Sequence, residues 1–123
     1  MTTLLIVSGG LVSKDPDASQ VFTLDWDLNS LAVGVTITAS TWLITAISPS
    51  QTDAVLTYDN AARLTAAQAT AAVGRTVAAD NRVTQVRLLA GTPGQRYEIE
   101  NTITTSETPA QIKIGRFVVL VED

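Results

Sequence analysis

Two pairs of aspartates at two-residue spacing are the groups in this sequence best suited to chemistry. Asp15 and Asp17 form the first pair, and Asp25 and Asp27 form the second. On a strand, residues two apart share a face, so each pair could offer two oxygen ligands to a calcium ion. No EF-hand-like loop supplies the remaining ligands, and Asp-Pro-Asp is ordinary turn chemistry. We therefore interpret both pairs as turn or surface residues and predict no metal site.

Glu98 and Glu100 form a third pair, on the polar face of an alternating segment. Two carboxylates act as acid and base when their surroundings separate their pKa values, and nothing in this sequence does so. The chain also has no cysteine and no histidine, which removes Cys–His pairs, Ser–His–Asp triads and the common zinc sites. We expect no catalytic residue, no cofactor and no enzymatic activity.

The composition is that of one soluble domain. The 123 residues are 46% hydrophobic and carry a net charge of −4, which is enough apolar material for a core. The arginines are scattered singly and predict no nucleic-acid partner. The apolar run from Leu4 to Val7 is too short to cross a membrane, and no basic residue precedes it as in a signal peptide. We expect a mature soluble chain that binds neither nucleic acid nor membrane.

Alternation of apolar and polar residues predicts six or seven strands. In the first confident strand, Phe22, Leu24, Trp26 and Leu28 are expected to point inward. A shift in the apolar phase of the next strand predicts a β-bulge near Ala39-Ser40. The main predicted strands are residues 20–28, 35–44, 54–58, 85–90, 96–105 and 111–121.

Two further expectations concern the later strands. Strands 85–90 and 96–105 flank the turn Gly91-Thr92-Pro93-Gly94, so we expect them to pair as antiparallel neighbours. In the last strand, a bulge at Gly115 is expected to bring Ile112 and Ile114 onto the face that carries Phe117.

The alanine-rich segment of residues 60–73 predicts one short helix within this β-rich chain. Asp59 or Asn60 can cap its start, and Gly74 is placed to end it. Irregular structure or an extra strand is the alternative. Residues 75–77 are expected to form a brief edge strand.

Trp26, Trp42 and Tyr97 fall in phase with aliphatic neighbours, so we interpret them as core residues and not as a ligand platform. Short strands with inward aromatic residues are typical of an immunoglobulin-like β-sandwich, here of about seven strands. A small barrel is the alternative. We divide the chain into an N-terminal arm, residues 1–19, and a sandwich domain, residues 20–123.

The arm carries the predicted contact surface. Its apolar residues are contiguous, so a strand formed by them would be apolar on both faces, either buried within the domain or docked on a partner. The predicted interface residues are Leu4, Leu5, Ile6, Val7, Lys14, Asp15 and Asp17.

Four segments in order also resemble a family of small virion proteins of tailed phages and prophages, often labelled fibre-tail adaptor proteins. The segments are KDPD at Lys14–Asp17, LDW at Leu24–Trp26, TITASTW at Thr36–Trp42 and AGTPGQRYEIENTITT at Ala90–Thr105. The chain departs from the family pattern at Ala90, where the family has glycine, and in the alanine-rich segment, which looks like an insertion.

The resemblance implies a non-enzymatic structural protein of the phage virion, assembled in the bacterial host cytoplasm. We expect an adaptor at the neck or tail that joins fibre or connector components, present as a homo-oligomer or symmetric array. The alternatives are a cement protein that decorates the major capsid protein shell and a carbohydrate- or surface-binding module. Deleting residues 1–12 is expected to leave a folded sandwich that no longer joins particles.

Overall fold

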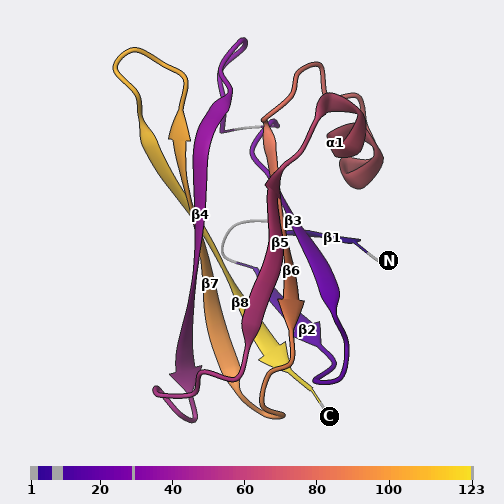
Figure 1. Cartoon of the computed structure of the whole chain (residues 1–123), viewed down its shortest axis with the longest axis vertical. Coiled ribbons are helices and arrows are strands. Elements are labelled where there is room, and N and C mark those ends of the chain that lie inside the picture. Colours follow the sequence, from indigo (N-terminus) through magenta and orange to yellow (C-terminus); the bar gives the residue numbers. More distant parts are fainter. Residues whose placement is uncertain (1–2, 7–9, 29, 123) are drawn as a thin grey trace.

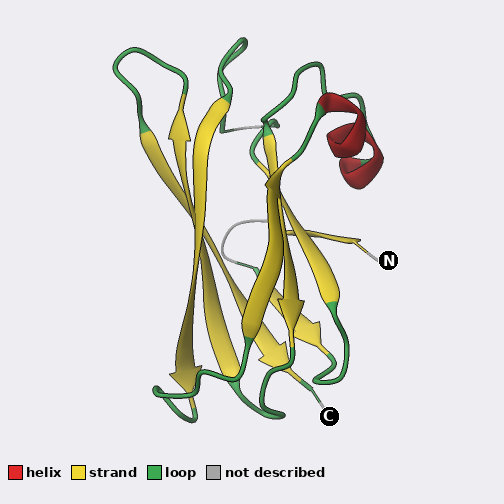
Figure 2. Ribbon diagram, in the orientation of Figure 1, coloured by secondary structure: helices red, strands yellow, loops and turns green. Residues whose placement is uncertain are grey.

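The protein is a sandwich of two four-stranded sheets with one helix at the side (Figures 1 and 2). The computed structural model describes the backbone of residues 3–6, together with residues 10–28 and 30–122. The elements are β1 (Thr3–Ile6), β2 (Leu11–Lys14), β3 (Gln20–Asp25), β4 (Ile37–Ser48), β5 (Thr57–Arg63), α1 (Ala66–Val73), β6 (Val83–Leu89), β7 (Arg96–Thr105) and β8 (Ile112–Val121).

The two sheets have the strand orders β1-β3-β6-β5 and β2-β8-β7-β4. All pairs are antiparallel except the two made by the N-terminal segment, in which β1 runs parallel to β3 and β2 runs parallel to β8. The segment of residues 1–19 thus contributes one strand to each sheet. Strands β3, β6 and β5 facing β8, β7 and β4 reproduce the constant-type immunoglobulin arrangement, which confirms the predicted fold.

The core lies between the sheets, where alternate residues of both inner faces meet. Phe22 of β3 and Phe117 of β8 stack across it with ring centroids 5.7 Å apart. Near the start of β7, the Tyr97 hydroxyl accepts a hydrogen bond from the Thr92 N–H (3.0 Å) and donates to Asp53 Oδ1 (2.7 Å). A tyrosine that ties the start of this strand to the preceding connection is a recurrent feature of immunoglobulin-like sandwiches. Burial, followed by the bond to Asp53, raises the pKa of Tyr97.

Inward positions were predicted well except at strand ends. Phe22, Leu24 and Trp26 are buried, but Leu28 is 63% exposed, because β3 ends at Asp25 and the Asp25 carboxylate accepts the Asp27 N–H in a turn. The strand predicted over 54–58 begins only at Thr57 and continues to Arg63.

The helix is shorter than predicted because β5 extends into the alanine-rich segment. Thr65, and neither Asp59 nor Asn60, caps the helix, in a reciprocal pair of hydrogen bonds with Gln68. Gly74 ends it in the left-handed conformation, as predicted (φ 77°). Residues 75–77 are not a strand; instead, Val77 packs in a small apolar cluster under the helix with Leu64, Ala69 and Val83.

Two predictions about strand pairing are wrong. The turn at residues 91–94 does not close a hairpin, because β6 and β7 belong to different sheets and the turn carries the chain across the core. The bulge predicted in β8 is absent, since β7 and β8 stay in register from Arg96–Leu120 to Thr104–Ile112. The bulge in β4 is confirmed by a register shift between Ile37 and Ala39.

Gly115 has a packing role in place of the predicted bulge. It lies on the inner face of β8, and a Cβ atom there would be 2.7 Å from Leu24 Cδ2 and 3.0 Å from the Trp26 ring. Ile112 and Ile114 therefore point outward, where they are 69% and 44% exposed.

Candidate protein–protein interface

The N-terminal arm pairs with the body of the sandwich through two short strands, β1 in its apolar run and β2 farther along the chain. The backbone of β1 follows β3, with Leu4 opposite Phe22 and Ile6 opposite Leu24. Val7, the last of the predicted apolar contact residues, lies outside the described residues. The described part of the run is thus an edge strand of the domain, and its role in contacts with a partner stays a prediction.

Lys14, which the sequence groups with the contact residues, is 1% exposed. Its ammonium donates hydrogen bonds to the carbonyl oxygens of Ala90 (2.7 Å) and Asp15 (2.8 Å). Burial lowers the pKa of Lys14, against the opposing charges of Asp15 and Asp17. Lys14 therefore fastens the end of β2 to the β6–β7 connection and offers no exposed charge to a partner.

Asp15 and Asp17 are exposed in the turn that follows β2. Asp15 Oδ1 accepts the Asp17 N–H (2.8 Å), and the Asp15 carbonyl accepts the Ala18 N–H (3.2 Å). The turn holds two carboxylates outward beside the anchored end of the arm, so both are available to an external cation or donor.

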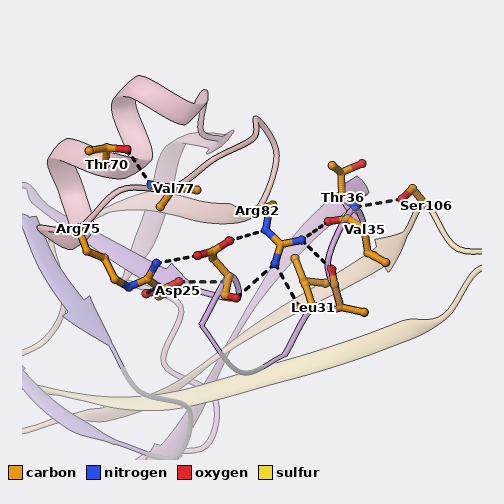
Figure 3. A network of polar contacts seen from close by, with 11 residues as sticks. Asp25, Leu31, Val35, Thr36, Thr70, Arg75, Val77, Arg82 and Ser106 are labelled. Carbon is orange, nitrogen blue, oxygen red and sulfur yellow. Dashed lines mark hydrogen bonds and ion pairs between the residues drawn. The ribbon is translucent and has the colours of Figure 1, made fainter.

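The second aspartate pair has a structural role (Figure 3). Arg75 donates to both Asp25 and Asp27, and Arg82 donates to Asp27 from the other side. Arg82 also donates to the carbonyl oxygens of Leu31, Ala32 and Val35, so it braces the β3–β4 connection. Burial raises the pKa of Asp27, but the hydrogen bonds from Arg82 and Arg75 outweigh it, and the pKa is lowered overall.

The strand edge on the opposite side of the sandwich was missed by the sequence interpretation. Here β4 and β5, the edge strands of the two sheets, flank a shallow apolar groove. Leu43 and Tyr58 are 56% and 43% exposed along it, and the largely buried Trp42 also contributes to its lining. The Trp42 indole N–H is buried and finds no acceptor among the described residues. The groove is lined by Trp42, Leu43, Ile44, Leu56, Thr57 and Tyr58.

The outer face of the β2-β8-β7-β4 sheet carries the glutamates of β7. Arg116 of β8 donates to Glu100 Oε2 (3.1 Å) and lies near Glu98 (3.9 Å). These carboxylates are half-buried on the sheet surface, away from the core, and form an ordinary surface ion pair.

Residues 3–6, 10–28 and 30–122 contain no group of three or more acidic, His or Cys side chains arranged to hold a metal ion. None of the helices in the same ranges is long and apolar enough to span a bilayer.

These features define an immunoglobulin-like β-sandwich with an N-terminal arm paired to both sheets and an apolar groove on the opposite side. A comparison with family models identifies the family of the chain. Residues 14–119 match the family described as "Podophage GP4 fiber-tail adaptor protein gp77", and the chain belongs to that family. The resemblance found in the sequence is thereby confirmed, and the protein is a structural adaptor of a phage virion. The comparisons with curated proteins and with solved structures gave no match.

Proposed function

We propose that the protein joins components at the neck or tail of the phage particle by strand-edge contacts, with the N-terminal arm as the principal contact element. The family description supports the fibre-tail junction as the location. The observation that supports this proposal best is the position of β1 at the edge of its sheet. Strand β1 pairs with β3 on one side, and its other side can pair with a strand of a neighbouring protein. Edge strands are ready templates for an added strand.

The contact surface combines this edge with the exposed acidic turn. It comprises Leu4, Leu5, Ile6 and Val7, followed by Asp15 and Asp17 at the other end of the arm. Lys14 lies between them as the internal anchor. Repetition of the contact around a symmetric array gives a strong junction from modest single contacts. The proposed contacts are between proteins, and they require no cofactor, nucleic acid or membrane.

Truncation of the arm tests the proposal. The cut belongs before Gly10, because the Gly10 carbonyl accepts the Val118 N–H and Val12 packs against the core. Deleting residues 1–9 removes β1 and retains β2. We expect the truncated protein to keep a cooperative thermal transition and to be missing from purified particles, or to yield particles without fibres, by electron microscopy.

Matched substitutions sharpen that test. Asp15→Asn with Asp17→Asn changes the exposed turn within an intact fold, whereas Glu107→Gln changes a partly exposed carboxylate in the β7–β8 connection, at the end of β8 that does not pair with β2. Normal particles from the folded truncated protein would rule out the arm as the contact element. Density for the chain on the head shell would instead support the decoration role.

A further inference from the structure

The edge of β4 is the least protected strand edge of the described molecule. Strand β4 is twelve residues long, has a strand partner, β7, on one side only, and contains no charged side chain. Its two register shifts lie near its ends, so its pairing with β7 is regular from Ala39 to Ala46. Soluble proteins normally protect such edges with charges, prolines or bulges, because a long, regular, apolar edge pairs with other strands.

The other described edges are protected or short. Strand β5 carries Asp59 and Arg63 and is interrupted by a register shift between Asp59 and Ala62. The part of β8 beyond its pairing with β2 carries Lys113 and Arg116. Strands β1 and β2 have four residues each. The contrast singles out β4.

We propose that β4 pairs with β4 of a second copy of this chain, antiparallel about a twofold axis at Leu43. A twofold contact requires a surface that is complementary to itself, and the β4 sequence meets this condition. With Leu43 opposite its own equivalent, Thr41 lies opposite Thr45 and Trp42 lies opposite Ile44. Paired threonines and an aromatic residue opposite a β-branched one are favourable cross-strand pairs.

The surroundings of β4 fit such an occupant. The exposed Leu43 side chain loses its contact with water against the same residue of the second copy. The added strand lies beside the groove between β4 and β5, whose lining near Leu43 is mainly apolar and uncharged. Arg63 of β5 lies toward the start of β4, where it donates to the Ile37 carbonyl (2.8 Å). A charged segment would lose its hydration here without gaining a counter-charge from β4, so an uncharged strand is the favoured occupant.

The inference deepens the proposed function, since it supplies the contact between copies, but its geometry does not rest on that function. A single strand pair buries less than a standard interface, so the dimer is weak in solution and strengthened in an array.

Sedimentation equilibrium of the full chain tests the pairing. We expect the average mass to rise from monomer toward dimer as concentration approaches millimolar. Leu43→Lys and Thr45→Lys, which place a charge on the outer side of β4, should each weaken association about tenfold or more. Ile114→Lys is the matched control, because it charges an exposed apolar residue on the outer face of β8 in the same sheet.

A covalent test does not depend on the lysine variants folding. The chain has no cysteine, so Leu43→Cys introduces a single thiol whose twofold equivalent would lie about 5 Å away between Cβ atoms. Oxidation should link two copies about tenfold or more faster than in Ile114→Cys.

A wild-type chain that stays monomeric, with equal linking rates for the two cysteine variants, would overturn the proposal and leave β4 to a strand from another virion protein. Association lost in Ile114→Lys and retained in Leu43→Lys would also overturn it. A monomeric chain that still enters particles through its arm would contradict only the β4 pairing and not the proposed function.

Discussion

The two tryptophans show how differently the same residue type is used inside one core. Trp26 donates its indole N–H to Thr84 Oγ1 (3.0 Å) and Asn101 Oδ1 (3.1 Å), whereas the Trp42 N–H has no acceptor among the described residues. A buried donor without an acceptor lowers the stability of the fold, whereas a buried donor with good acceptors adds to it.

Replacement of each tryptophan by phenylalanine therefore has unequal effects. Trp26→Phe removes two hydrogen bonds together with ring volume, and Trp42→Phe removes ring volume alone. We expect Trp26→Phe to lower the free energy of unfolding by about 1 to 2 kcal/mol more than Trp42→Phe. Urea unfolding of the two variants, which serve as controls for each other, measures the difference. Equal losses would mean that the Trp42 N–H is hydrogen-bonded in solution.

The lowered pKa of Asp27 predicts acid sensitivity. A carboxyl group whose pKa is lower in the folded than in the unfolded state stabilises the fold above its unfolded pKa, near 4, and this stability is lost as the pH falls through the folded value. Asp27→Asn should lower stability at pH 7 by about 3 kcal/mol, since it leaves the buried Arg82 without its carboxylate.

Thermal melts across pH measure this effect. Between about pH 4 and pH 2, the melting temperature of Asp27→Asn should fall less steeply than that of the wild type. Glu122→Gln should follow the wild-type curve. An unchanged slope in Asp27→Asn would show that other carboxylates, such as the Arg87-paired Asp59, account for the acid dependence.

At the scale of elements, Gly115 sets how closely β8 approaches β3 across the core. Gly115→Ala would place a methyl group against Leu24 and the hydrogen-bonded Trp26 ring, and neither can move freely in a packed interior. We expect a loss of about 1 to 3 kcal/mol.

A double-mutant cycle with Leu24→Val identifies the cause. Leu24→Val shortens the side chain that the new methyl group would meet, so the double variant should lose less stability than the sum of the single variants. Strict additivity would place the cost in the backbone of β8 and not in this contact.

Local alternation explains which parts of the fold were predictable. Phe22, Trp42 and Tyr97 were assigned to the core correctly, because the inward face of a strand depends on its own two-residue period. The same period is satisfied whether two consecutive strands are neighbours in one sheet or face each other across the core. The β6–β7 hairpin was therefore predicted wrongly from correct strands.

The candidate interface was less predictable, because burial of polar groups depends on distant parts of the chain. Lys14 looks like an exposed turn residue, and one of the two carbonyl oxygens that accept from its buried ammonium belongs to Ala90, far along the chain. Asp25 and Asp27 likewise resemble a cation site until Arg75 and Arg82 are folded against them. The open edge of β4 has a visible signal, a twelve-residue strand without charge, but the sequence alone does not reveal that it lies at an edge.

At the scale of the molecule, the two sides of the sandwich differ in whether additional strands cover the sheet edges. On one side, the N-terminal segment adds β1 to one sheet and β2 to the other. On the other side, β4 and β5 meet across an open groove with no strand covering it in the described residues. This asymmetry gives the molecule one side for the proposed arm contact and another for the proposed contact between copies.

The parallel pairing of β2 with β8 also has a consequence for synthesis. Leu11 of β2 lies opposite Val118 of β8. Strand β2 therefore cannot pair until β8 has been synthesised. Such distant pairing is slow to form, and β8 leaves the ribosome after every other strand described. A product terminated before Ile112 lacks β8, so β2 has no strand to pair with in such a product.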